Sequence, residues 1–301
     1  MTICIESKVE EEELKAYISE LHLNNGEKIE LNDDDIIVFV GSNNVGKSQA
    51  LMDLYSLCGR TYPDDGFSDE DQTVVIKDIK LTSFEKETMA KEALEQGWAL
   101  QTKKGIKIRN DIFTEEGLKS EIQNKGFGEL YNSYVFYSSA GEDGNTSASA
   151  NYYDDDTRYD PIHFLSDYRD LRQKASDGFR RAFNHDLLPN RMHGGFIPLC
   201  IGSESELDLR TEGKKGNEAL DSYLEFMSSL PVIEDQSDGI KSFTSILVNL
   251  VLKHKKLFIM DEPESYLHPP QAQIMGQIIA EYIDGRQAFI ATHSQDVIKG
   301  F

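Results

Sequence analysis

The sequence is poor in cysteine and lacks long apolar runs. Only three cysteines occur in 301 residues, at Cys4, Cys58 and Cys200. They are far apart, so their spacing predicts neither a metal site nor a disulfide framework. No apolar run approaches the roughly 20 residues of a membrane-spanning helix, and the N-terminus has neither the basic start nor the apolar core of a signal peptide. We therefore expect a soluble, cytoplasmic protein with no membrane partner.

Basic residues are also scarce. The chain has 31 Lys and Arg against 53 Asp and Glu, a formal net charge of −22, which repels a polyanion from most of the surface. Any DNA contact must therefore use a local basic patch or belong to another chain. A predicted hairpin over 98–109 and a predicted helix over 168–185 concentrate the basic residues, namely Lys103, Lys104, Lys107, Arg109, Arg169, Arg172, Lys174, Arg180 and Arg181. For the hairpin, a solvated tip is the alternative interpretation.

The best-defined motif is GSNNVGKS at residues 41–48, which fits Gly-x-x-x-x-Gly-Lys-Ser. A strand pattern, IIVFV, precedes it and a helical pattern follows, which is the context of a phosphate-binding loop rather than of a simple glycine-rich turn. Gly41 and Gly46 let backbone N–H groups converge on an anion, Lys47 can reach β/γ phosphates, and the Ser48 hydroxyl can bind Mg²⁺. We predict ATP and Mg²⁺ as cofactors, bound by Gly41, Ser42, Asn43, Asn44, Val45, Gly46, Lys47, Ser48 and Gln49.

Two later apolar strands also end in chemically useful side chains. The stretch LFIMDEPESYLHP at residues 257–269 places Asp261 and Glu262 at a strand end. A carboxylate there suits Mg²⁺, and a second one could polarise an attacking water. The stretch AFIATHS at residues 288–294 ends near His293, where an imidazole could sense a γ-phosphate. His293 alone could be an ordinary polar residue at a strand end, but three such clusters favour one common site.

The alternation of strands and helices predicts an α/β fold, with a mainly parallel sheet flanked by helices plus an inserted lobe. We expect residues 1–60 to form one half of the core with the phosphate loop, residues 61–215 the inserted lobe, and residues 216–301 the other half. Residues 8–23 are expected to form a short amphipathic helix or an edge element, and residues 204–216 a polar connection.

Taken together, GSNNVGKS, SDGIKS, LFIMDEPE with SYLHP, and FIATHS resemble the ABC-type ATPase heads of the SMC–RecF–OLD group, most closely the OLD-like branch. The resemblance covers roughly residues 27–58 and 230–299. It implies that Asp261 is the Walker B carboxylate that holds Mg²⁺, Glu262 the catalytic base, residues 265–268 the D-loop and His293 the switch histidine, with Lys47 assisting catalysis. No Q-loop glutamine can be assigned, because Ser138 and Ser139 stand in the expected region.

Ser237 and Gly239 open the predicted helix over 237–253 and resemble the ABC signature, which in such families binds the γ-phosphate held by a second head. A serine hydroxyl and free N–H groups at a helix N-terminus can bind an anion, although the same residues would also make an ordinary N-cap. The resemblance therefore implies a homodimer or higher oligomer, paired through an ATP sandwich.

By the same resemblance we expect an ATP-hydrolysing head that controls a nuclease or toxin effector, in antiphage defence or DNA processing. OLD-like proteins commonly continue into a Toprim nuclease domain, for which this chain has no room. The effector is thus expected to be a separate protein or a missing C-terminal domain, and nuclease activity is not expected of this chain. The alternative is an ATP-gated scaffold or sensor with slow or no turnover. A transporter subunit is disfavoured because the signature is not LSGGQ.

Overall fold

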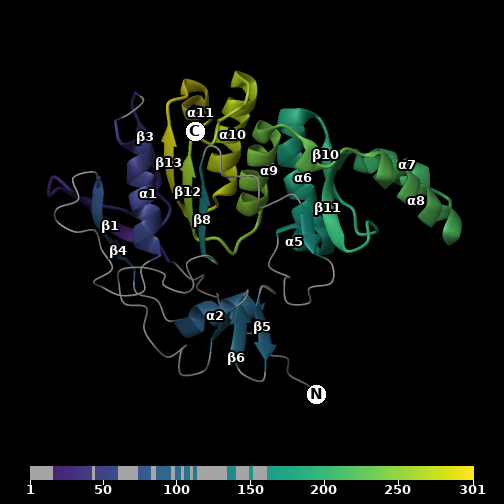
Figure 1. Cartoon of the computed structure of the whole chain (residues 1–301), viewed down its shortest axis with the longest axis horizontal. Coiled ribbons are helices and arrows are strands. Elements are labelled where there is room, and N and C mark those ends of the chain that lie inside the picture. The colour runs from purple at the N-terminus through teal and green to yellow at the C-terminus, as the bar shows by residue number, and fades with distance from the viewer. Residues whose placement is uncertain are drawn as a thin grey trace, which may run out of the picture.

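A four-stranded parallel sheet forms the centre of the molecule, in the order β3–β13–β12–β8 (Figure 1). The computed structural model describes residues 16–42, 45–59, 74–82, 86–95, 99–102, 105–108, 111–113, 134–139, 149–151 and 161–301. The strands of this sheet are β3 (Ile36–Val40), β13 (Gln287–Thr292), β12 (Leu257–Asp261) and β8 (Val135–Ser138). The predicted α/β fold with a parallel sheet is confirmed. The division into domains stays a prediction, and β8 lies within the 61–215 stretch.

The apolar strands divide their side chains between two cores, one on each face of the sheet. In β12, Leu257 and Ile259 join one core, whereas Phe258 and Met260 join the other. Successive side chains of a strand point to opposite faces, so a strand covered on both faces must be apolar at nearly every position. This requirement explains the continuous apolar runs of β12 and β13, which are buried, whereas β3 at the edge of the sheet is only half-buried.

The first face is covered by α1 (Lys47–Cys58) and by an antiparallel sheet of order β2–β1–β4. The strands of that sheet are β1 (Ile18–Leu23), β2 (Lys28–Glu30) and β4 (Ile76–Leu81). Residues 8–23 were expected to form an amphipathic helix or an edge element, but the described part holds β1, the middle strand of this sheet, so both alternatives are wrong there. Gln287 joins the two sheets, because its buried amide accepts a hydrogen bond from the Ile18 N–H and donates to the Ile18 carbonyl, each at 2.9 Å.

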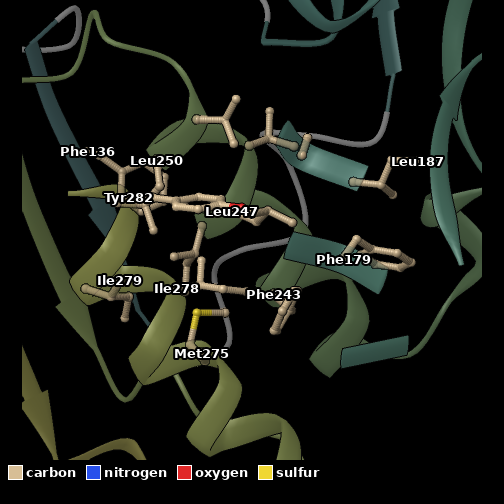
Figure 2. Close-up of a cluster of buried hydrophobic side chains, with 14 of the residues drawn as sticks. Phe136, Phe179, Leu187, Phe243, Leu247, Leu250, Met275, Ile278, Ile279 and Tyr282 are labelled. Carbon is tan, nitrogen blue, oxygen red and sulfur yellow. The ribbon is translucent and has the colours of Figure 1, made fainter. Parts of the chain in front are cut away.

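The second face is covered by α9 (Asp238–Val251) and α10 (Pro269–Tyr282), with α6 (Arg169–Phe183) packed outside them. Figure 2 shows this core, in which Phe179 of α6, Phe243 of α9 and Met275 of α10 lie close to one another. The helix α9 is buried along nearly its whole length. The start of α9, where the predicted signature lies, is therefore fixed relative to the sheet.

The remaining elements lie around this core. An antiparallel sheet of order β10–β11–β9 adjoins α5 and α6, and a second one has the order β5–β6–β7.

The predicted polar connection at 204–216 was wrong, because Ser203 accepts a hydrogen bond from the Glu206 N–H and caps a helix, α7. Within the described part of the chain, no helix has the length and apolar character needed to cross a bilayer. The bounds are α2 (Lys86–Glu95), β5 (Ala99–Thr102), β6 (Gly105–Ile108), β7 (Asp111–Phe113), β9 (Ser149–Asn151), α5 (Pro161–Asp167), β10 (Asp186–Pro189), β11 (Phe196–Gly202), α7 (Glu204–Thr211), α8 (Asn217–Ser229), the 3-10 turn Ile233–Asp235 and α11 (Gln295–Gly300).

Candidate functional site

The carboxyl ends of β3, β13 and β12 meet at one edge of the parallel sheet. The strand register pairs Thr292 with Val40 and Asp261 with Ala291. The phosphate-loop motif follows β3, Asp261 is the last residue of β12, and His293 follows β13. Ligands of open parallel sheets bind at this edge, so the fold brings the three predicted clusters together.

The phosphate-loop motif turns directly into α1. Gly46 adopts φ 91°, a left-handed conformation that favours glycine, and serves as the N-cap of the helix. Lys47 is buried, and its ammonium group donates hydrogen bonds to the Gly41 and Ser42 carbonyls, each at 2.9 Å. The side chain thus folds back over the loop, and its ammonium group is held by two loop carbonyls. The predicted Asn43 and Asn44 lie outside the described residues, and Val45 is exposed.

Gln49 links α1 to the neighbouring sheet. Its amide donates to the Asp53 carboxylate at 2.7 Å, and Asp53 is fully buried. The same carboxylate accepts the backbone N–H groups of Val75 and Ile76, at 2.7 and 3.0 Å. Gln49 therefore contributes to the anchoring of the helix, and its predicted role in cofactor binding stays a prediction.

Ser48 and Asp261 form the predicted metal site. The Ser48 hydroxyl lies close to the Asp261 carboxylate, whose Oδ1 atom is buried without a hydrogen-bond partner. Burial raises the pKa of Asp261, and the nearby Glu262 charge adds to this, while the Ser48 hydroxyl and the Lys47 charge oppose it. A buried carboxylate oxygen that lacks a donor is well suited to a cation.

Ser48 and Asp261 suit a Mg²⁺ ion whose other ligands come from a nucleotide and water, rather than a metal ion bound by protein side chains alone. Within the described ranges, no group of three His, Cys, Asp or Glu side chains could hold a metal ion. Mg²⁺ is commonly bound by one or two protein ligands together with substrate phosphates and waters. Ser48 and Asp261 would supply the protein's share of such a shell, and Mg²⁺ bound there would neutralise charge on the phosphate oxygens.

Glu262 and His293 contact each other directly. The His293 Nδ1 atom lies 3.0 Å from Glu262 Oε1. Glu262 adopts φ 49°, and its backbone N–H donates to the Ala291 carbonyl at 2.8 Å, which completes the last pair of the β12–β13 ladder, Asp261 with Ala291. Both side chains remain partly exposed, at 30% and 51%. The carboxylate and the imidazole are therefore paired and open to solvent, as a group that activates water must be.

One residue of this site was not predicted. Glu264 is buried, its Oε1 atom accepts a hydrogen bond from the Thr292 hydroxyl at 2.5 Å, and that atom lies 3.7 Å from His293 Nδ1. Its Oε2 atom is buried without a partner. The only sequence signal is a second glutamate two positions after Glu262. An acidic residue in a loop is usually exposed, so the signal did not stand out.

The predicted signature lies against the D-loop stretch of the same chain. Gly239 is buried, and a Cβ atom there would lie 2.4 Å from the Tyr266 carbonyl oxygen. Tyr266 adopts φ 63° and its side chain is 69% exposed. Ser237 is exposed and is the N-cap residue of α9 by position, but its side chain makes no capping hydrogen bond. The Ser237 hydroxyl therefore does not cap α9 as the side chain of an ordinary N-cap residue would.

The cations of α6 are largely engaged by neighbouring groups. Arg172 bonds to Glu204 at 3.3 Å, and Arg181 bonds to Glu281 at 2.8 Å. Arg180 bonds to Asp177 and Asp186, and Lys174 lies over the Tyr282 ring. Paired cations attract a phosphate backbone less than free ones do. In the predicted hairpin, Lys103, Lys104 and Arg109 lie outside the described residues, so a DNA contact stays a prediction for both segments.

The chain is similar to several solved structures. The SmcHead bound to the C-winged helix domain of ScpA is 12% identical, with a TM-score of 0.51, and the match covers 94% of this chain and 91% of that chain. The SMC head domain from Thermotoga maritima is 11% identical, with a TM-score of 0.40 and coverage of 95% and 90%. An Smc head with an extended coiled coil from Pyrococcus furiosus is 14% identical, with a TM-score of 0.32 over 48% of this chain, which spans 33% of that one. The match to the SmcHead confirms the predicted fold.

Two comparisons concern the sequence itself. No curated protein matches the chain. A family model described as "AAA domain, putative AbiEii toxin, Type IV TA system" matches residues 36–299, which include all three strand ends of the candidate site. The OLD-like branch and its antiphage setting stay predictions. Because the model spans most of the chain, the protein belongs to this family of AAA domains.

Proposed function

We propose that the chain is an ATP-binding and ATP-hydrolysing head of the ABC type, which dimerises around ATP and controls an associated effector. The observation that carries the proposal is the meeting of Lys47, the Ser48–Asp261 pair and the Glu262–His293 pair at one edge of the parallel sheet. A cation, an oxygen pair for Mg²⁺, and a carboxylate open to water are the parts that phosphoryl transfer to water requires.

In this proposal each residue has one task. Lys47 moves from the loop carbonyls to the β/γ phosphates, which accept its hydrogen bonds instead. Glu262 takes a proton from a water as the water oxygen attacks the γ-phosphorus. The bond between that phosphorus and the bridging oxygen breaks, giving ADP and inorganic phosphate. His293 lies beside Glu262 and contacts the γ-phosphate, and Ser237 and Gly239 close over it from a second head.

The effector is proposed to be a Toprim nuclease or a toxin, carried by a separate protein or by a C-terminal domain, in antiphage defence or DNA processing. The family description, which names a putative toxin of a type IV TA system, supports a toxin rather than a nuclease as the effector. Direct DNA binding through local basic patches is the weaker part of the proposal, because most of the α6 cations are paired.

A steady-state ATPase assay with Mg²⁺ or EDTA, with and without duplex DNA, tests the proposal. We expect turnover that requires Mg²⁺. Lys47→Ala removes a charge-assisted contact to phosphate worth about 1.5–3 kcal/mol, so ATP affinity should fall roughly 10- to 100-fold. Lys253→Ala is the matched control, because Lys253 is exposed and precedes β12, at the opposite end of that strand from the site.

Unchanged ATP affinity in a folded Lys47→Ala protein would exclude the phosphate-loop assignment. Tight ATP binding with no turnover by the unmodified protein would instead favour the ATP-gated scaffold or sensor.

A further inference from the structure

Glu264 is a buried carboxylate beside the two residues proposed to handle water and phosphate. Its side chain is 8% exposed, and only one of its two oxygens has a hydrogen bond. Burial of a carboxylate is costly unless the group is well paired. The partly unpaired Glu264 is therefore not explained by stability alone, and its neighbours indicate what it does.

Glu264 fixes the turn that carries His293. The Thr292 hydroxyl donates to Glu264 Oε1 at 2.5 Å and accepts the Ser294 N–H at 2.9 Å. Thr292 is fully buried, and its one hydroxyl proton is used by Glu264. The residues before and after His293 are thus both held through one carboxylate.

Glu264 also offers His293 a second hydrogen-bond acceptor. The His293 Nδ1 atom lies 3.0 Å from Glu262 Oε1 and 3.7 Å from Glu264 Oε1. A hydrogen bond from Nδ1 occupies Glu262 Oε1, so that oxygen is not available to accept a proton from water. A small rotation of the exposed imidazole toward Glu264 would exchange one acceptor for the other and release Glu262 for water.

We propose that Glu264 is a positioning residue for ATP hydrolysis, which holds the His293 turn in place and accepts the Nδ1 hydrogen bond when Glu262 acts on water. This inference rests on the proposed function. It does not make Glu264 a group that touches the substrate, since its effect passes through Thr292 and His293.

The first test is Glu264→Gln, measured in single-turnover and steady-state ATPase assays. The amide oxygen that replaces Oε1 carries no full negative charge, so it accepts the hydrogen bonds of Thr292 and of His293 Nδ1 more weakly than the carboxylate does. We expect kcat to fall roughly tenfold, as misplaced catalytic groups do, with KM for ATP within about twofold. Glu264→Ala, which loses both interactions, should be slower than Glu264→Gln. The matched control is Glu281→Gln, an exposed carboxylate on α10 that pairs with Arg181.

A double-mutant cycle separates positioning from simple support of the fold. If Glu264 acts through His293, Glu264→Gln should lower single-turnover rates in the unmodified protein and have little further effect in a His293→Ala background. Equal losses in the two backgrounds, or an unchanged kcat, would overturn the inference. Should the Glu264 variants not fold, Thr292→Val in the same cycle tests the hydrogen bond that Glu264 accepts.

A spectroscopic measurement does not depend on turnover. The ring nitrogens of His293 can be assigned by ¹⁵N NMR as the signals absent in His293→Ala. We expect the Nδ1 signal to shift in Glu264→Gln but not in Glu281→Gln, and no shift would contradict the contact. If the unmodified protein binds no ATP, the proposed function fails. If it hydrolyses ATP while the cycle is additive, only the role of Glu264 fails.

Discussion

Asp261 is a residue at which stability and function make opposite demands. Burial raises its pKa in the folded chain above the value in the unfolded chain, and Oδ1 has no donor. The folded state therefore binds the proton more tightly, so the ionised group destabilises the fold at any pH above the raised pKa. This cost disappears as the pH falls through the raised pKa and below the unfolded value. At neutral pH, a bound cation would remove the same cost.

We predict that Asp261→Asn raises the melting temperature at neutral pH, measured without Mg²⁺ and nucleotide, and abolishes Mg²⁺-dependent ATPase activity. The amide keeps the shape of the side chain, but it carries no charge. The difference in melting temperature between the two proteins should shrink as the pH is lowered toward 4, near the usual carboxyl pKa of about 3.9.

The control for that prediction is Asp221→Asn on α8, an exposed residue at which the same change should shift stability by less than about 0.5 kcal/mol. A melting temperature that falls in Asp261→Asn at neutral pH would show that the ionised carboxylate stabilises the fold.

The sequence predicted the residues whose chemistry is set by a local motif. Lys47, Asp261 and His293 each follow an apolar strand, and parallel pairing alone brings such positions to one sheet edge. Glu264 could not be predicted in the same way. Its burial depends on the left-handed turn at Glu262, which directs the following residues back toward Thr292. The roles given to all these residues stay predictions.

At the scale of elements, the contact between α9 and the D-loop stretch joins two segments that are distant in sequence. Gly239 lies so close to the Tyr266 carbonyl that an added Cβ would approach it to 2.4 Å. The contacted atom is a backbone carbonyl oxygen, so rotation of a side chain cannot relieve the overlap. The spacing between the signature and the D-loop is therefore set by this glycine.

We predict that Gly239→Ala forces these segments apart, costs about 1–3 kcal/mol of stability, and lowers ATPase activity more than ATP binding. Denaturant unfolding, ATP titration and ATPase rates measure the three quantities. Gly178→Ala is the matched control: its Cβ would meet the end of the flexible Leu247 side chain at 2.6 Å, in a helix remote from the strand ends. Equal ATPase losses in the two variants would contradict a specific role for the Gly239 contact.

Element prediction failed where burial gave no pattern to follow. The helix α7 has no buried residue, so its sequence lacks the apolar stripe by which helices are recognised. Its start was nevertheless encoded, because Ser203 and Glu206 have the spacing of a helix cap. The strand β10 is short and ends in Pro189, which removes a backbone donor and weakens any strand signal. Its place in the sheet depends on pairing with β11, which no local pattern reveals.

At the scale of the whole molecule, the proposed site is incomplete in one chain. The Ser237 hydroxyl is exposed and makes no capping hydrogen bond. Each head also carries a net charge of −22, which opposes pairing. Repulsion between exposed charges is screened over about 8 Å at physiological ionic strength. We therefore expect head-to-head association to require ATP and to strengthen with moderate salt, unlike the binding of a basic protein to DNA.

We predict that Glu262→Gln binds Mg-ATP, fails to hydrolyse it, and accumulates as an ATP-bound dimer. The amide keeps the reach of the side chain but removes its basicity. Ser237→Arg should leave ATP binding by the single head intact and block pairing, because a bulky side chain occupies the shared anion site. Sedimentation of each variant with saturating Mg-ATP distinguishes a dimer from a monomer, and the unmodified protein with ADP is the control.

Mixing the two variants gives the sharper result. In a heterodimer of Glu262→Gln with Ser237→Arg, one composite site carries both changes and the other carries neither. Partial ATPase activity should therefore return on mixing if the heads pair face to face and the two sites act independently. Each variant alone should remain inactive. A strictly monomeric Glu262→Gln protein at saturating Mg-ATP, together with no recovery on mixing, would exclude the sandwich for this chain. Ser237 would then be only the residue at which α9 begins.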